Sequence, residues 1–331
     1  MKKNIAIVAG GDSSEVVVSL KSAEGLHSFM DKQRFNVWIV TIIGKTWQVE
    51  YSENEKYPID KNDFSFSRKG EKIVFDFAYI TIHGTPGENG ILQGYFNLIG
   101  LPFSCCDVLP AAITFNKFTC NQFLKNFDVR TAASVLLRKN EKIDSQKISE
   151  KTGFPCFVKP NAGGSSFGVS KVKSIEQLEP AIQKAFSEDD EVVVESFLAG
   201  TEVTCGMYKT KEKRVVFPLT EVVSQNEFFD YDAKYKGQVQ EITPARISSM
   251  LTEKVQLQTA RIYDILGCKG LVRIDYIISE TDEIFLLEVN TTPGMTPTSF
   301  IPQQIKAAGL NITDVLTEII ENELNCNTLI K

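Results

Sequence analysis

Residues 271–296 constrain the fold more than any other part of the chain, because they predict two strands joined by a tight turn. Apolar and β-branched residues flank a polar tetrad, which has a usual length for a hairpin loop. We assume that Ser279 pairs with Ile284 across this loop. Asp275 then lies opposite Glu288, and both side chains share one face because side chains alternate along a strand. Directly opposed Cβ atoms are about 4.5–5.5 Å apart, so the two carboxylates repel each other unless a positive charge lies between them.

The same register places Arg273 opposite Asn290 on the carboxylate face. We expect Leu271, Ile277, Ile284 and Leu286 on that face, and Val272, Ile274, Tyr276, Ile278, Leu287 and Val289 on the other. Neither face is therefore fully solvated, and unpaired buried charges are costly. A divalent cation held by Asp275, Glu288 and Asn290 resolves the repulsion, and all-oxygen ligands favour Mg²⁺ or Mn²⁺ over zinc. The alternative is an ordinary hairpin on which Arg273 alone neutralises a polar stripe. The Pro-Gly loop after the second strand favours the metal interpretation, because loops at strand ends carry chemistry.

The composition indicates a protein that acts on small molecules. The chain has 331 residues, enough for two or three domains, and 43% of them are hydrophobic, which excludes disorder. Lys and Arg total 36 against 42 Asp and Glu, and the absence of a long basic run predicts neither a nucleic-acid nor a membrane partner. No apolar segment approaches the roughly 18 residues of a membrane span, and the N-terminal apolar run is too short for a signal peptide. The seven cysteines show no disulfide framework and indicate cytosolic packing residues.

The N-terminal part predicts a Rossmann-like unit. Residues 4–9 predict a short buried strand, and the glycines at 10–11 turn the chain into a helix. Candidate caps of this helix are Asp12, Ser13 and Ser14. Residues 36–43 and 75–82 predict two further strands. The fingerprint G-x-G-x-x-G is absent, so a nicotinamide cofactor has little support.

Two polar residues near these strand ends have both a structural and a functional interpretation. In an open α/β sheet, ligands collect beyond the carboxyl ends of the strands, where both residues lie. Glu15 in the first helical turn complements the helix macrodipole, and the residues alone favour that explanation. His83 begins the loop HGTPGENG, and it either holds this loop by a ring-to-backbone hydrogen bond or takes part in catalysis.

The central part predicts a second group of strands around a glycine-rich loop. Residues 111–127 predict a helix with Lys117 near its middle, and residues 154–172 predict two strands that bracket a Gly-Ser loop. Small residues let backbone N–H groups approach an anion closely, and Lys159 near the end of the first strand adds charge. The Walker A pattern is missing, so a flexible turn remains the alternative to a phosphate cradle. Residues 191–198 predict another strand.

The C-terminal third combines an irregular segment with two helical patterns. Residues 224–243 carry aromatic residues and lysines without periodicity, which is typical of a functional lid or a disordered segment. Helical patterns at 301–308 and 313–324 close the chain, the second of them with a cap near Asn311 or Thr313.

Six stretches together resemble the D-alanine–D-alanine ligases of the ATP-grasp superfamily. They are Gly10-Gly11 with Glu15, IHGTPGENG, VKPNAGGSSFGVSKV, FFDYDAKY, RID and LLEVNTTPGMT. The resemblance spans nearly the whole chain, in order. It implies an α/β chain, α+β overall, with a Rossmann-like N-terminal domain over 1–105 and a two-subdomain ATP-grasp fold. The central subdomain is expected over 106–198, and the C-terminal subdomain, with the metal site and the lid, over 199–331.

The resemblance also implies which residues bind ATP and metal. The residues expected at the phosphates are Lys117, Lys159, Ser165, Ser166 and Lys234. Those expected at adenine are Glu195, Phe197 and Leu198, with Glu202 at the ribose. The family's magnesium ligands match Asp275, Glu288 and Asn290, the set that the hairpin register also selected, and two Mg²⁺ or Mn²⁺ ions are expected.

For the amino-acid substrates, the resemblance overrides the helix-dipole explanation of Glu15, which matches the anchor of the first D-alanine ammonium. Arg273 and the Gly294 N–H match the groups that hold the first carboxylate and then the developing oxyanion. The second D-alanine carboxylate is expected at Ser299 and the backbone of Phe300, and His83 is expected to bind substrate. Phe300 is often leucine in the family and Phe229 often tyrosine, which affects affinity rather than activity.

The implied activity is the ligation of two D-alanine molecules at the expense of ATP, through an acyl phosphate, for peptidoglycan synthesis in the cytoplasm by a homodimer. Tyr235 matches a lid tyrosine that joins Glu15 and Ser165, and depsipeptide-forming relatives tend to lack it, so we expect an amine acceptor. The alternatives are a D-alanine–D-lactate ligase, another ATP-grasp carboxylate–amine ligase, and a nucleotide-binding sensor that has lost catalysis. The intact set of charged residues argues against the sensor.

Overall fold

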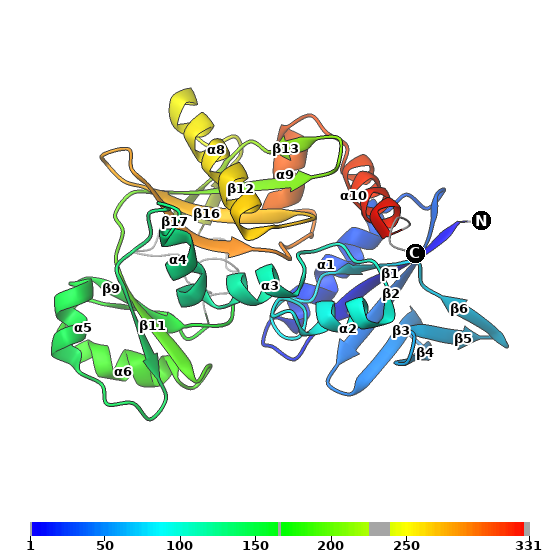
Figure 1. Cartoon of the computed structure of the whole chain (residues 1–331), viewed down its shortest axis with the longest axis horizontal. Helices are drawn as coiled ribbons and strands as arrows, with labels where there is room; N and C mark the ends of the chain where they lie inside the picture. The colour runs from blue at the N-terminus through cyan, green and yellow to red at the C-terminus, as the bar shows by residue number, and fades with distance from the viewer. Residues whose placement is uncertain (1, 165–166, 225–238, 328–331) are drawn as a thin grey trace.

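The structure is a computed structural model, which describes residues 2–164, 167–224 and 239–327. Three β-sheets organise these residues (Figure 1). In strand order they are β6-β5-β4-β3-β2-β1-β7, then β10-β9-β11-β8, and then β15-β14-β12-β16-β17 with β13 beside β12. The second and third sheets are antiparallel throughout, as expected for two subdomains that bind a ligand between them.

The first sheet has a parallel centre and an antiparallel extension. Its centre consists of β1 (Lys3–Gly10), β2 (Phe35–Ile43) and β7 (Phe77–Ile80), with β1 paired in parallel to both neighbours. The carboxyl ends of β1 and β7 therefore meet at one edge, which brings the Gly10 and His83 loops together. The extension, which the sequence interpretation missed, consists of β3 (Thr46–Ser52), β4 (Glu55–Asp60), β5 (Ser65–Arg68) and β6 (Glu71–Val74).

Two helices accompany this sheet, α1 (Val16–Phe29) and α2 (Ile91–Ile99). The expected N-cap of α1 is wrong, because Glu15 is the cap position and no side chain makes a cap hydrogen bond there. The hydroxyl of Ser13 donates instead to the carbonyl of His83 over 2.9 Å. The carboxylate of Asp12 accepts from the N–H of Gly44 over 2.6 Å. Asp12 and Ser13 thus tie the first loop to neighbouring loops, and the Ser13 hydroxyl also accepts from the N–H of Glu15 over 3.2 Å.

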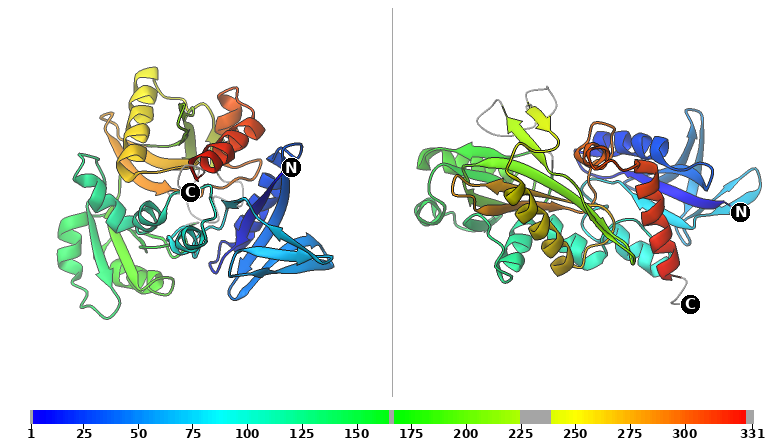
Figure 2. Two further views of the ribbon diagram at one scale, coloured as in Figure 1. Left: turned by 45° about the vertical axis from the view of Figure 1, so that its right-hand side comes forward. Right: turned by 90° about the horizontal axis from the view of Figure 1, so that it is seen from above.

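The second sheet forms a small domain with two helices on one face (Figure 2). Its strands are β8 (Ser134–Arg138), β9 (Cys156–Pro160), β10 (Ser170–Val172) and β11 (Glu191–Ser196). The helices are α5 (Ser145–Thr152) and α6 (Ile175–Ala185). The predicted pair of strands around the Gly-Ser loop is confirmed as β9 and β10, which run antiparallel.

Helices α3 (Val108–Phe115) and α4 (Lys117–Lys125) precede this sheet. The single helix predicted over 111–127 is wrong, because the backbone breaks at Asn116, where ψ is 99°. The Asn116 side chain accepts from the N–H of Thr119 over 2.8 Å and so begins a new helix. Lys117 is therefore the first residue of α4, where it lies against the glycine-rich loop, and does not lie in mid-helix.

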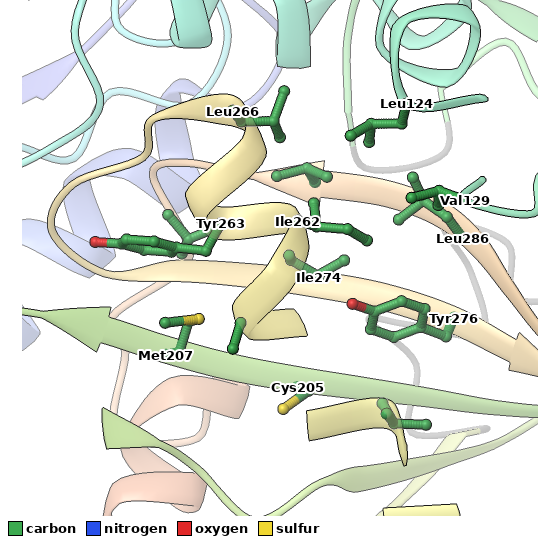
Figure 3. Close-up of a cluster of buried hydrophobic side chains, with 14 of the residues drawn as sticks. Leu124, Val129, Cys205, Met207, Ile262, Tyr263, Leu266, Ile274, Tyr276 and Leu286 are labelled. Carbon is green, nitrogen blue, oxygen red and sulfur yellow. The ribbon is translucent and has the colours of Figure 1, made fainter. Parts of the chain in front are cut away.

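The third sheet carries the largest core. Its strands are β12 (Thr201–Lys209), β13 (Arg214–Val216), β14 (Thr220–Ser224), β15 (Val239–Ile242), β16 (Val272–Ile278) and β17 (Ile284–Asn290). Helix α8 (Ser249–Leu266) covers one face, and its Ile262 and Tyr263 pack with Ile274, Tyr276 and Leu286 of the hairpin (Figure 3). The opposite face of the hairpin is left free to line a cleft.

The predicted register of the β16–β17 hairpin is confirmed where it carries charge. Asp275 pairs with Glu288, and Arg273 pairs with Asn290. All four side chains therefore lie on the face away from α8, since strand side chains alternate.

Nearer the turn the predicted register is wrong. Ile278, and not Ser279, pairs with Ile284, because a bulge shifts the pairing in the middle of the hairpin. One extra residue on β17 reverses the facing of the β17 side chains between the bulge and the turn, whereas Ile277 and Ile278 of β16 keep their expected faces. Ile284 and Leu286 consequently pack in the core, whereas Leu287 lines the cleft, the reverse of the expected faces.

The C-terminal helices α9 (Phe300–Ala307) and α10 (Ile312–Asn327) join the two ends of the chain. Apolar residues of α9 and α10, such as Ile301, Ile305 and Leu316, share a core with Ile5 and Ile7 of β1. The N-terminal sheet is thus packed directly on the C-terminal part (Figure 1). Among the described residues, no helix is long and apolar enough to cross a membrane.

Candidate active site

Two adjoining cavities lie between the three sheets, with volumes of about 770 Å³ and 560 Å³. The larger one is lined by these predicted residues: Glu15, Lys117, Lys159, Glu195, Phe197, Leu198, Glu202, Arg273, Asp275, Glu288 and Phe300. The smaller one is lined by His83, Asn290, Gly294 and Ser299, and again by Glu15, Lys117, Arg273, Glu288 and Phe300. Every predicted site residue that the structure describes therefore borders one continuous cleft. Ser165, Ser166, Lys234 and Tyr235, with Phe229, lie outside the described residues.

The charged face of the hairpin is a closed network. The Arg273 guanidinium donates to both carboxylate oxygens of Asp275, over 2.9 and 2.8 Å, and lies 3.9 Å from Glu288. The amide of Asn290 donates to Asp275 over 3.1 Å and to Glu288 over 3.3 Å. Thr204 on β12 also donates to Asp275. The bidentate contact supports the alternative in which Arg273 neutralises one carboxylate, but Glu288 remains to be neutralised by other groups.

Glu288 is surrounded by cations from three different elements. Its carboxylate lies 3.8 Å from the Lys117 ammonium group on α4. Burial acts to raise the pKa of Glu288, but the charges of Lys117, Arg273 and Lys159 outweigh burial and lower it to about 2. Glu288 is therefore ionised at neutral pH, with a side chain 35% exposed toward the cleft.

The donor set at this face fits a hard divalent cation. Asp275 and Glu288 offer carboxylate oxygens from opposed positions, and Asn290 lies beside both. In the structure the Asn290 amide presents its nitrogen to the carboxylates, and a half-turn of that amide presents its oxygen instead. Carboxylate and amide oxygens are the ligands that Mg²⁺ and Mn²⁺ prefer.

On the second sheet, Lys159 and Glu195 form a buried ion pair. The two side chains, on β9 and β11, are 2.6 Å apart, and 15% and 8% exposed. Asn121 on α4 donates to the same carboxylate over 3.3 Å. The pair joins a residue expected at the phosphates, Lys159, to one expected at adenine, Glu195. The ring of Phe197 packs against Phe157. Lys159 is thus oriented by a fixed partner before any ligand arrives.

The N-terminal loops supply a second acidic group to the cleft. The carboxylate of Glu15 lies against the glycine-rich loop, where a Cβ on Gly164 would be only 2.7 Å from a Glu15 oxygen. Glu88 accepts from the N–H of Gly84 and from the hydroxyl of Thr292, both over 2.7 Å. Burial, with the nearby charge of Glu15, raises the pKa of Glu88 to about 7. The two acidic groups on this side of the cleft therefore repel each other when both are ionised.

The Pro-Gly loop and the start of α9 close the smaller cavity. The hydroxyl of Ser299 accepts from the N–H of Thr296 over 3.1 Å, and a Cβ on Gly294 would lie 3.0 Å from that hydroxyl. Phe300 begins α9, and its ring centre is 5.2 Å from the Arg273 guanidinium carbon. The backbone at Gly294 and the side chain of Arg273 thus border the same space.

Four contributors to this cleft were missed from the sequence. They are Glu88, Asn121, Thr204 and Thr292. Asn121 had a local signal, because it follows Lys117 by one helical turn and so shares its face. Glu88 also had one, as a carboxylate within a glycine-rich loop at a strand end. Thr204 and Thr292 had none, since their partners lie far away in the sequence.

The fold has an N-terminal α/β domain joined to two antiparallel sheets, and charged residues of these parts face a shared cleft. This arrangement defines a protein of the ATP-grasp class. The sequence matches two family models, "D-ala D-ala ligase N-terminus" over residues 4–106 and "D-ala D-ala ligase C-terminus" over residues 123–321. The chain belongs to the D-alanine–D-alanine ligase family. It is 65% identical over 323 residues to the D-alanine–D-alanine ligase of Bacteroides fragilis, covering 98% of this chain and 100% of that protein.

Solved structures agree with this assignment. The VanG D-Ala:D-Ser ligase from Enterococcus faecalis is 30% identical and superposes with a TM-score of 0.88, covering 98% of this chain and 100% of that chain. The D-alanine–D-alanine ligase from Bacillus anthracis complexed with ATP is 27% identical, with a TM-score of 0.78 over 99% of this chain and 100% of that chain. The fold expected from the resemblance is therefore confirmed.

Proposed function

We propose that this protein ligates two D-alanine molecules to D-alanyl-D-alanine, with conversion of ATP to ADP and phosphate, as a step of peptidoglycan precursor synthesis. The observation that carries the proposal is the shared cleft. In it, cations suited to phosphates (Lys117, Lys159) border the same space as a candidate ammonium anchor (Glu15) and the backbone of Gly294. The identity of 65% with a ligase of that name supports the same activity.

ATP is the co-substrate that we assign to the larger cavity. The volume of about 770 Å³ suits a nucleotide. We assign the phosphates to Lys117 and Lys159, adenine to the segment of Glu195, Phe197 and Leu198, and the ribose to Glu202. From the sequence we add Ser165, Ser166 and Lys234 to the phosphate site. A relative from Bacillus anthracis was solved in complex with ATP, which supports ATP as the co-substrate.

We assign two Mg²⁺ or Mn²⁺ ions to Asp275, Glu288 and Asn290. The low pKa of Glu288 supports this, because an ionised carboxylate is ready to bind a cation at neutral pH. When bound, the metal offsets negative charge on the phosphoryl group during its transfer. In the structure the Arg273 guanidinium binds the carboxylate of Asp275. We expect this guanidinium to turn toward the substrate when the Asp275 carboxylate binds a metal ion instead.

The chain's own groups then act in two steps. Glu15 anchors the ammonium of the first D-alanine. The carboxylate of this D-alanine attacks the γ-phosphorus of ATP, while Lys117 and Lys159 stabilise the negative charge on the transferred phosphoryl group. The products of this step are an acyl phosphate and ADP, which leaves from the γ-phosphorus. The second D-alanine, held near His83, Ser299 and the Phe300 backbone, attacks the acyl carbon with its amine. Arg273 and the Gly294 N–H stabilise the oxyanion, and phosphate leaves. Exclusion of water matters, because an exposed acyl phosphate would hydrolyse.

Three further proposals concern organisation. We place domain boundaries near residues 105 and 198, which the three separate sheets support. We expect a homodimer, and a candidate contact is the exposed apolar residues of α2 and α3, Ile91, Leu98 and Leu109. We place the enzyme in the cytoplasm, where ATP is available, in keeping with seven cysteines that are all free thiols.

The acceptor identity can be tested directly. The purified chain is incubated with ATP, Mg²⁺ and D-alanine, and the product is identified by mass spectrometry alongside ADP release. Competition with D-lactate and D-serine at neutral pH then separates the alternatives, since the VanG relative is a D-Ala:D-Ser ligase by name. We expect D-alanyl-D-alanine to dominate. ADP release that does not depend on D-alanine, or a dominant depsipeptide, would contradict the proposal.

A further inference from the structure

The loop that carries Gly294 is held by the N-terminal domain on both sides of this glycine. On the far side, the N–H of Met295 donates to the hydroxyl of Ser22 over 3.3 Å. On the near side, the hydroxyl of Thr292 donates to the Glu88 carboxylate over 2.7 Å. Each contact joins residues more than 200 positions apart in the sequence. The loop therefore owes its place to a different domain from the one that encodes it.

Ser22 is built for this contact. It lies on the buried face of α1 and is 0% exposed. Its oxygen accepts from Met295 and lies 3.4 Å from Nε2 of His83, so the hydroxyl proton is directed to that ring when Nε2 is unprotonated. One buried hydroxyl thus connects the Pro-Gly loop to the histidine loop. Removal of a buried hydrogen-bond partner leaves the other groups unsatisfied.

A steric contact one turn further along α1 also shows that this helix positions the Gly294 loop. A Cβ on Gly25 would lie 2.3 Å from the carbonyl oxygen of Met295, so the helix backbone rests directly on the loop backbone. Glycine is otherwise unfavourable in a helix interior. Its presence here matches a need for close approach between α1 and the loop.

We propose that Ser22 and Thr292 are positioning residues that hold the Gly294 N–H where the oxyanion forms. Ser22 accepts from the backbone N–H of Met295, directly after the glycine. Thr292, two residues before the glycine, donates to the carboxylate of Glu88. The proposal rests on the proposed ligase function. A backbone donor stabilises an oxyanion only within a narrow range of positions, and a misplacement of about 1 Å reduces a rate by about 100-fold. Neither Ser22 nor Thr292 needs to touch the substrate for this role.

The test compares Ser22→Ala, Thr292→Val and their double variant with wild type. The matched control is Ser28→Ala on the same helix, whose hydroxyl donates to the Gly25 carbonyl over 2.7 Å and has no bond to the loop. Rapid-quench measurements follow ADP and dipeptide in the first turnover, and thermal unfolding checks the fold. The two products report on acyl-phosphate formation and on amine attack separately.

We expect dipeptide formation to fall by roughly 10- to 100-fold in each single variant and further in the double variant, with first-turnover ADP formation changed by no more than a few-fold. Ser28→Ala should match wild type. Equal losses in ADP and dipeptide, or no loss, would overturn the positioning role. If Ser22→Ala does not fold, Thr292→Val decides the outcome in the same way. If wild type forms no dipeptide, the proposed function fails instead, so the two failures are distinguishable.

Discussion

Two glutamates in the same cleft have opposite electrostatic environments. Glu288 on the hairpin faces Lys117, Arg273 and Lys159, and these charges overcome burial to lower its pKa to about 2. Glu88 on the histidine loop faces Glu15 instead, and burial together with that charge raises its pKa to about 7, in spite of two hydrogen bonds.

The difference teaches that burial raises the pKa of a carboxyl group unless nearby cations outweigh it. Burial favours the neutral form of both carboxyl groups. Cations from three elements converge on Glu288, which keeps it charged and ready for a metal. Glu88 receives only neutral donors from Gly84 and Thr292 at hydrogen-bonding distance. The smaller cavity is therefore bordered by one glutamate that is ionised at neutral pH, Glu288, and by one that still binds a proton near pH 7, Glu88.

The largest effect is expected from Glu288→Gln. The change removes one negative charge from the proposed metal site while it keeps the side-chain shape, so ligase turnover should fall by at least about 100-fold at saturating Mg²⁺. The fold should be retained, since no apolar contact is lost, but the thermal midpoint should fall because the charge of Glu288 no longer offsets Lys117 and Arg273. ADP release and thermal unfolding measure the two quantities. Wild-type turnover in this variant would remove Glu288 from the metal site.

The next effect is expected from Lys117→Met. Loss of this charge should raise the pKa of Glu288 and weaken phosphate binding, so kcat/KM for ATP should fall by roughly 10- to 100-fold. The effect should be much smaller in a Glu288→Gln background, because residues in one charged network do not act additively. Steady-state kinetics of the two single variants and the double variant measure this coupling. Strict additivity would show that Lys117 and Glu288 act separately.

A smaller effect concerns the pH dependence of stability. The pKa of Glu88 is about 7 in the folded protein, above the value of about 4.3 in an unfolded chain. The folded protein therefore binds the extra proton between these values, and the free energy of unfolding falls as pH rises through 7, by on the order of 1–3 kcal/mol. Glu88→Gln should remove this dependence.

Thermal unfolding between pH 5 and pH 8 measures that slope. Glu288→Gln is the matched comparison, because the pKa of Glu288 lies far below this range and its contribution is lost only as pH falls toward 2. The slope should thus persist in Glu288→Gln and vanish in Glu88→Gln. The same slope in both variants would assign it to other groups.

The smallest effect is expected from Lys139→Ala. Lys139 pairs with Asp190 over 2.9 Å, but the two side chains are 54% and 81% exposed. Water and salt screen such a pair, so the free energy of unfolding should change by no more than about 0.5 kcal/mol. Denaturant unfolding measures this value. A larger loss would show that exposed pairs in this chain act like the cleft charges.

Much of the site was predictable because it depends on local periodicity. Alternation is enough to place Arg273 with Asp275 on one face of β16, and Glu288 with Asn290 on one face of β17. The pairing of Asp275 with Glu288 also depends on the bulge, because the turn pairs Ile278 with Ile284. Glycines and lysines at strand ends likewise indicated the loops around the cleft. The same reasoning failed at Lys117, since the helix break depends on one cap at Asn116.

The sequence by itself determined the order of the elements, the charged face of the hairpin and the family resemblance, all of which depend on neighbouring residues. Only the tertiary structure decided the bulge that turns Leu287 toward the cleft, and the contacts of Glu88 and Ser22 with the Gly294 loop. The bulge interrupts the regular pairing of the two strands, and the contacts join residues more than 200 positions apart. Periodicity carries no information about either, because it describes a segment and not the partner that the fold brings to it.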